Sequence, residues 1–74
     1  MSKKLPIIIS GKKLIKILAK LGFQITRQKG SHVILWKNDI YVTVPLHKEI
    51  KKGTLKAILK QANINLDEFF NALK

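Results

Sequence analysis

The chain has 74 residues, no cysteine, and fifteen Lys and Arg against four Asp and Glu, which gives a formal net charge of +11. This length suffices for one small domain with one core, residues 1–74, and leaves no room for a large enclosed pocket. The composition excludes disulfides and zinc–thiolate sites, fits a reducing cytoplasm, and contains no run of the roughly 18 apolar residues that span a membrane.

The first half of the chain predicts a helix followed by three strands. Ser10 is a favoured N-cap and Gly22 a favoured stop, and apolar residues recur between them at helical spacing, so we expect a helix over about residues 11–21. Alternating and β-branched segments then predict strands with short turns between them, which favours an antiparallel meander. In chain order these are the strand 23–26, the turn 29–31, the strand 32–36, the turn 38–39 and the strand 41–44, closed by Pro45.

Two further helices are predicted near the end of the sequence. Apolar residues at helical spacing indicate a helix from about Thr54 to Ala62, and Asn63-Ile64 interrupts it. Asn65, with Glu68 three residues later, is close to a capping box and predicts the start of a short third helix. The apolar stripe of this last helix is interpreted as packing residues: Leu66, Phe69, Phe70 and Leu73.

The order α-β-β-β-α-α predicts an α+β fold. A three-stranded antiparallel sheet with one helix before it and one after it buries its apolar residues only if both helices lie on one face of the sheet. This is the arrangement of the double-stranded-RNA-binding fold. Alternation puts His32 and Trp36 on one face of the middle strand and Val33 on the other, but leaves open which face the helices cover.

Each of the first two helices carries a row of lysines four residues apart, which puts each row on one helix face. The rows are Lys12, Lys16 and Lys20, and Lys52, Lys56 and Lys60. No acid stands four residues from any of them, so the like charges repel one another and slightly destabilise the helices. An ordinary solvated face would explain the rows too, but a feature that reduces stability favours contact with phosphate groups.

Both helix starts combine cations with unpaired backbone N–H groups, which bind phosphate well although cations there oppose the helix dipole. Lys12 and Lys13 lie in the first turn of the first helix. Lys51 and Lys52 are expected just before the second helix, where Thr54 adds a hydroxyl. The two starts therefore predict an anion-binding surface, and the charge as a whole favours a partner that is nucleic acid, an acidic protein, or both in turn.

The segment from Arg27 to His32 is the strongest candidate for chemistry. Histidine has the side chain whose ordinary pKa lies closest to neutrality, and the nearby cations Arg27 and Lys29 disfavour its charged form. We therefore expect a mostly neutral His32 that accepts a proton, on a surface suited to RNA, whose 2′-hydroxyl supplies a nucleophile. Gly30 gives the turn backbone freedom and lets RNA approach, while Ser31 orients the histidine or contacts phosphate. A plain turn would explain Gly30 equally well.

Several short segments also recur together in one known family. They are Ser10-Gly11-Lys12, Leu21-Gly22-Phe23, Gly30-Ser31-His32, Val42-Thr43-Val44-Pro45 with His47, Lys51-Lys52-Gly53-Thr54-Leu55, and Ile58-Leu59-Lys60-Gln61-Ala62. Together they resemble HicA-type toxins, the RNA-cleaving components of HicAB toxin–antitoxin modules, and the resemblance covers nearly the whole chain. The resemblance implies a toxin that cleaves mRNA, arrests translation, is neutralised by a HicB-like antitoxin, and uses a catalytic histidine at the position of His32.

Two positions depart from the pattern that the resemblance implies. Many relatives have a second histidine where this chain has Val33, so no help is expected from that position. Many also have an acid where this chain has Lys13, so the first helix is expected to lack a capping box. Neither departure removes the expected base.

The expected reaction is metal-independent transesterification, with no cofactor. His32 takes the proton of the 2′-hydroxyl, which attacks the adjacent phosphorus and leaves a 2′,3′-cyclic phosphate and a 5′-hydroxyl end. Lys29, Lys51 and Lys52 are candidates to stabilise the phosphorane. His47 is a candidate proton donor if the exit of the third strand lies near the start of the second, although an exposed or partner-contacting role fits it as well.

Two interpretations stay open at the level of sequence. Trp36 either stacks on a base, fills the antitoxin interface or covers the core. The alternative function is a non-catalytic double-stranded-RNA-binding module, in which His32 is only a contact residue. Activity distinguishes the two functions, because only the toxin leaves cyclic-phosphate ends. Few acids and two separated histidines do not favour a metal site.

Overall fold

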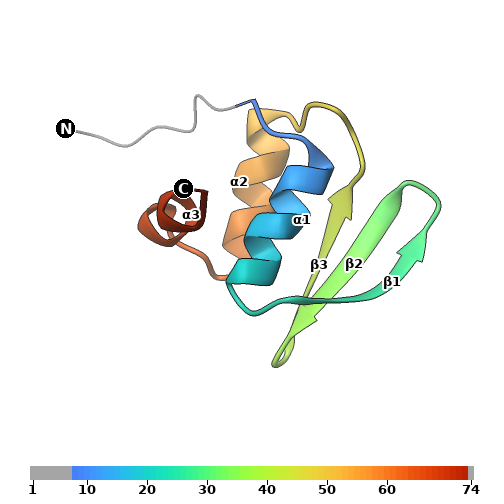
Figure 1. Cartoon of the computed structure of the whole chain (residues 1–74), viewed down its shortest axis with the longest axis horizontal. Coiled ribbons are helices and arrows are strands. Elements are labelled where there is room, and N and C mark those ends of the chain that lie inside the picture. Colours follow the sequence, from blue (N-terminus) through green and yellow to red (C-terminus); the bar gives the residue numbers. More distant parts are fainter. Residues whose placement is uncertain (1–7, 74) are drawn as a thin grey trace.

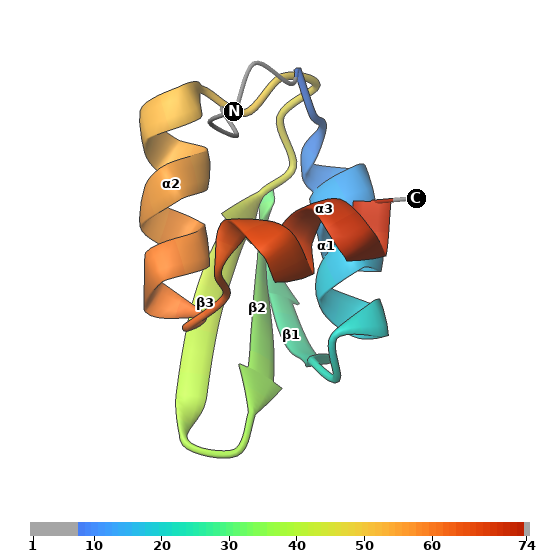
Figure 2. The same ribbon diagram turned by 90° about the vertical axis from the view of Figure 1, so that its left-hand side faces the viewer.

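The computed structural model of the protein describes residues 8–73, and these residues form one three-stranded sheet and three helices. In chain order the elements are α1 (Gly11–Lys20), β1 (Gln24–Lys29), β2 (His32–Lys37), β3 (Ile40–Pro45), α2 (Lys52–Gln61) and α3 (Leu66–Leu73). The sheet is antiparallel with the strand order β1-β2-β3. Helices α1 and α2 cover one face of it, and α3 lies on the far side of these two helices (Figures 1 and 2). The predicted α+β fold of the double-stranded-RNA-binding type is confirmed.

The helices cover the face of the sheet that carries Val33 and Leu35, which answers the question that alternation left open. Both side chains are buried, and so are Val42 and Val44, which stand opposite them in β3. Phe69 of α3 is also fully buried, so the outer helix contributes to the same core. Burial of apolar surface is the main stabilising contribution in a domain of this size. Among residues 8–73 no helix lies on the opposite face of the sheet, and we call it the open face (Figure 1).

Helix α1 begins and ends where the sequence predicts. The Ser10 hydroxyl accepts a hydrogen bond from Lys13 N (3.1 Å), and Gly22 follows the helix with a φ of 101°. Gly11 is buried against the end of β3, because a Cβ at this position would overlap the carbonyl oxygen of Pro45. Glycine here lets the start of α1 pack directly on the exit of β3.

The strands are longer than their apolar patterns indicate, β1 most of all. Its predicted range was 23–26, whereas the observed strand runs from Gln24 to Lys29. Every side chain in β1 is exposed, so its second half has no apolar pattern to reveal it, although it pairs fully with β2. A register shift between Ile25 and Arg27 marks a β-bulge, which also interrupts the alternation.

Helix α2 starts earlier than predicted. Lys51 is its N-cap, with extended backbone and no side-chain capping bond, and Lys52 is already the first helical residue. The expectation that Lys52 precedes the helix was therefore wrong, and Gly53 lies in the first turn. The reason is that Lys-Lys-Gly contains none of the side chains that usually mark a helix start.

Helix α3 follows a turn at Asn63 and begins with a capping box, both as predicted. Asn63 ends the preceding segment with a φ of 59°. Asn65 N donates to Glu68 Oε1 (3.1 Å), and Glu68 N donates to Asn65 Oδ1 (2.8 Å), which is the reciprocal pattern of a capping box. Within residues 8–73, no helix combines the length and apolar character needed to cross a bilayer.

Candidate functional site

Four segments meet at one end of the molecule, the upper end in Figure 1: the β1–β2 turn, the exit of β3, and the starts of α1 and α2. Three backbone hydrogen bonds join these segments: Leu46 N to Ser31 O (2.7 Å), Gly11 N to His47 O (2.9 Å) and Ile50 N to Ile9 O (2.8 Å). Most of the candidate site residues named from the sequence belong to these segments. The fold therefore gathers residues that lie as far apart as Lys12 and Thr54 in the chain.

His32 is the first residue of β2 and lies at the edge of this end. It pairs with Lys29 in β1 and with Pro45 in β3. Its side chain is exposed and, by alternation with the buried Val33, belongs to the open face. Within residues 8–73 no hydrogen bond engages the imidazole. The exposed imidazole is therefore open to a ligand.

The turn before His32 consists of Gly30 and Ser31. Gly30 has a φ of 61°, which favours glycine at the first position of a two-residue hairpin loop, and a Cβ there would meet no atom within 4 Å. The Gln28 amide donates to Gly30 O (3.3 Å) and steadies the turn. Among the described residues the Ser31 hydroxyl has no hydrogen bond to His32.

The bulge in β1 aligns two cations with His32. Lys29 is the direct cross-strand partner of His32, and Arg27 is the partner of Ile34, so both belong to the open face. In a strand without the bulge, alternation from Gln24, the partner of Trp36, would turn Arg27 and Lys29 to the other face. The place of Arg27 in the site could not be predicted from the sequence, where it is only a nearby charge, because a bulge in a polar strand leaves no clear pattern.

The helix starts contribute the other cations of this end. Lys12 and Lys13 are exposed in the first turn of α1, and Lys51 and Lys52 are exposed at the start of α2. Because Lys51 makes no side-chain capping bond, the first N–H groups of α2 remain available to an anion. Thr54, also exposed, lies in the same first turn.

His47 meets the geometric condition set for it from the sequence. It comes directly after Leu46, whose N–H donates to Ser31 O, so the exit of β3 does lie beside the start of β2. The side chain of His47 is exposed. Its carbonyl oxygen accepts the hydrogen bond from Gly11 N, which fixes the backbone of the loop at this position.

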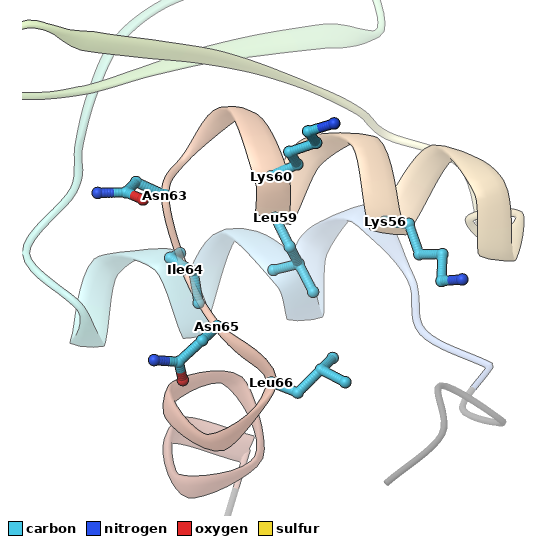
Figure 3. Close-up of a pocket in the computed structure, with 7 residues that line it drawn as sticks. All are labelled: Lys56, Leu59, Lys60, Asn63, Ile64, Asn65 and Leu66. Atoms are coloured by element: carbon cyan, nitrogen blue, oxygen red, sulfur yellow. The ribbon is translucent and has the colours of Figure 1, made fainter. Parts of the chain in front are cut away.

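Lys56 lies further from this end, one turn or about 6 Å beyond Lys52 along α2. It borders a groove of about 540 Å³ between α2 and α3, into which Leu59 and Leu66 extend (Figure 3). Lys60 lies on the same rim. In α1, Lys20 donates to Ala72 O of α3 (3.1 Å), so the third lysine of that row contacts another helix.

Trp36 lies at the opposite end of β2, about 13 Å from His32 at 3.3 Å per residue. It is 38% exposed on the open face, so the interpretation that it covers the core was wrong. Its ring contacts that of Tyr41, its partner in β3, with centroids 6.3 Å apart. Tyr41 was missed as a site residue, because strand alternation alone did not show which face was open.

Within residues 8–73 no three His, Asp or Glu side chains lie close enough together to hold a metal ion. The described part of the chain therefore offers no group of ligands for a metal.

In comparison with known families, residues 11–64 match the family described as "HicA toxin of bacterial toxin-antitoxin". This range contains α1, the sheet and α2, and it stops before α3. No curated protein matches the chain.

Proposed function

Because the chain belongs to the HicA family of toxins of bacterial toxin–antitoxin systems, we propose that it is a metal-independent endoribonuclease acting on mRNA. We further propose that its antitoxin is a HicB-like protein. The observation that carries the proposal is the exposed, unbonded His32 beside Lys29, at the end of the molecule where two helix starts bring further cations. A base next to a phosphate-binding surface is what cleavage of RNA by its own 2′-hydroxyl requires.

In the proposed reaction His32 is the general base. One ring nitrogen takes the proton of the 2′-hydroxyl, the 2′-oxygen forms a bond to the adjacent phosphorus, and the bond from phosphorus to the 5′-oxygen breaks. The products are a 2′,3′-cyclic phosphate and a 5′-hydroxyl end. The departing 5′-oxygen needs a proton, for which His47 and water are the candidates, since the loop of His47 lies beside the start of β2.

The cations supply charge for the phosphorane, which is more negative than the ground state. Lys29 shares the cross-strand row of His32, and Lys51 and Lys52 stand at the uncapped start of α2. Preorganised donors of this kind commonly give the largest single contribution to catalysis. Lys12, Lys13 and Thr54 extend the same surface and would hold the RNA backbone on either side of the cleaved bond.

Cleavage of a defined single-stranded RNA in EDTA tests the proposal, with the native chain, a His32→Ala variant and a His47→Ala variant in parallel. The native chain should cut, and His32→Ala should lose roughly 10²–10⁴-fold in rate, the usual contribution of a positioned base. His47→Ala tests the candidate proton donor in the same assay: a reduced rate would support that role, and a native rate would leave water to protonate the 5′-oxygen. Equal cleavage by the native chain and His32→Ala would refute the assignment of the base.

The alternative is a non-catalytic module that binds double-stranded RNA. The fold itself and the exposed lysines of α1 and α2 favour it, because proteins of this fold bind A-form RNA by shape and phosphate contacts. Under this alternative neither the native chain nor His32→Ala cuts RNA, while both retard a duplex equally in a binding assay.

A further inference from the structure

We propose that the end of the open face furthest from His32 is a subsite for one base of the RNA substrate, built on Trp36 and Tyr41. This inference rests on the proposed function, because it takes single-stranded RNA as the substrate. It adds a second contact region, distinct from the lysines of the helix starts, and it assigns a role to the exposed aromatic pair.

The aromatic pair has the properties of a stacking platform. Trp36 and Tyr41 are cross-strand partners whose rings tilt by 37° with centroids 6.3 Å apart. They are 38% and 57% exposed, on the face that no helix of the described residues covers. A rigid sheet holds both rings, so little freedom is lost when a base stacks on them. Such stacking accepts any base and is a common way to bind single strands.

A shallow depression of about 600 Å³ lies beside the Trp36 ring and offers groups that can read a base. It is lined by Gly22, Gln24, Trp36, Lys37, Asn38 and Asp39. Within residues 8–73 no hydrogen bond engages the side chains of Gln24, Asn38 or Asp39, so their donors and acceptors are available.

The side chain of Lys37 lines this depression and is held in place by two contacts. Its Nζ donates to Leu21 O (2.7 Å) and lies 5.7 Å from the centroid of the Phe23 ring. The hydrogen bond joins the end of β2 to the end of α1, so the depression keeps its shape.

Guanine fits these groups best. An ionised aspartate only accepts hydrogen bonds, and it has two oxygens to do so. The Watson–Crick edge of guanine has two adjacent donors, N1–H and N2–H, whereas each other base has one donor group there. Asp39 would therefore select guanine among bases that stack on Trp36, and the side-chain NH2 groups of Gln24 and Asn38 can donate to its O6 and N7.

The open face connects this subsite to His32. Three cross-strand rows follow one another along it: Lys29 with His32, Arg27 with Ile34, and Gln24 with Trp36. The two cations lie on the His32 side of the path and suit the phosphates of a strand that crosses the sheet. The interval of about 13 Å equals roughly four stacked nucleotides at 3.4 Å each, and fewer when the strand is extended. The recognised base therefore lies two to four nucleotides from the cleaved bond.

The fluorescence of Trp36, the single tryptophan of the chain, reports directly on this subsite. We would titrate the His32→Ala variant, which leaves RNA intact, with a short oligouridine and with the same oligonucleotide carrying one central guanosine. Both should quench the fluorescence, and the guanosine should tighten binding about tenfold, an advantage that Asp39→Asn should remove. Absence of quenching by both oligonucleotides overturns the subsite, and equal affinities overturn the role of Asp39. Quenching by the antitoxin but by neither RNA assigns this face to the protein partner and also overturns the proposal.

Cleavage profiles separate this inference from the proposed function. With a substrate library, Trp36→Ala should raise KM about 10- to 100-fold and lose the base preference two to four nucleotides from the cut, whereas Trp36→Phe should keep both. If Trp36→Ala cuts with the native preference and the native KM, the subsite is refuted and the nuclease stands. If the native chain does not cut at all, the nuclease is refuted, and the fluorescence titration still decides whether Trp36 binds a base.

Discussion

Arg27, Lys29 and His32 share one face of the sheet because β1 contains one extra residue. The bulge between Ile25 and Arg27 reverses the alternation of the strand, so that two cations which would otherwise face the helices stand on the open face. Bulges occur often beside functional sites, where they redirect side chains. At this scale, a single insertion in a polar strand determines the charge around the proposed base.

Gly30 allows a direct test of how closely RNA approaches the turn. Asparagine tolerates the φ of 61° at this position better than other residues with a Cβ, and a Cβ would meet nothing within 4 Å, so Gly30→Asn should lose less stability than other substitutions there. If RNA packs against the turn, the added side chain displaces it, and a displacement of about 1 Å can reduce the rate about 10²-fold. We expect a smaller loss of thermal stability than from other substitutions at this position, and strongly reduced cleavage.

The matched control for this variant is Gly30→Ala, which has a smaller side chain but fits the left-handed conformation less well, with strain of about 1–2 kcal/mol. It should unfold earlier than Gly30→Asn and yet cleave faster. Native cleavage by Gly30→Asn would mean that glycine serves the turn alone.

At the scale of elements, the sequence predicted each helix and strand but not all of their limits. The strong predictions rested on side chains with a defined local role: Ser10 at the start of α1, and Asn65 with Glu68 at the start of α3. The weak predictions concerned polar segments, whose secondary structure depends on contacts with other parts of the chain and not on their own side-chain pattern. The second half of β1 pairs with β2 although nothing in it is buried, and Lys52 is helical although no capping side chain precedes it.

The start of α2 should account for a measurable share of the salt dependence of RNA binding. Each phosphate contact on a single strand contributes about 0.7 to the slope of log K against log salt concentration. The double variant Lys51→Ala, Lys52→Ala should therefore reduce the magnitude of the slope by about 1.4 relative to the native chain. Filter binding or anisotropy over a range of salt concentrations measures it.

The control for this prediction is Lys60→Ala, at the other end of the same helix and on the rim of the groove between α2 and α3. This variant removes one positive charge far from His32, and it should leave the slope of log K against log salt concentration unchanged. Equal losses from both helix ends would indicate that RNA contacts the whole length of α2 instead of its start.

In the molecule as a whole, the topology of the fold determines where the candidate site residues lie. A meander whose two helices share one face brings both helix starts, the first turn and the exit of β3 to one end, and leaves the other face of the sheet open (Figure 1). The candidate residues at that end were predictable as residue types in their local sequence. Their proximity was not, because it depends on hydrogen bonds such as Leu46 N to Ser31 O, which join positions far apart in the chain.

The charge of +11 also predicts how the antitoxin binds. An acidic partner should associate rapidly at low salt, and the association rate constant should fall steeply with ionic strength, while the dissociation rate changes less. Stopped-flow mixing of the toxin with its antitoxin, across salt concentrations, measures both constants. An association rate that does not depend on salt would contradict an interface based on complementary charge.

The proposed cleavage of RNA through the substrate's own 2′-hydroxyl, with His32 as the base, requires that hydroxyl at the cleaved position. The most direct measurement compares two RNAs in EDTA, identical except that one lacks the 2′-hydroxyl at the cleaved position. We expect the native chain to cut only the unmodified RNA and to leave a 2′,3′-cyclic phosphate and a 5′-hydroxyl end. Cleavage of the 2′-deoxy substrate at the same bond, or products with 5′-phosphate ends, would contradict the proposed reaction.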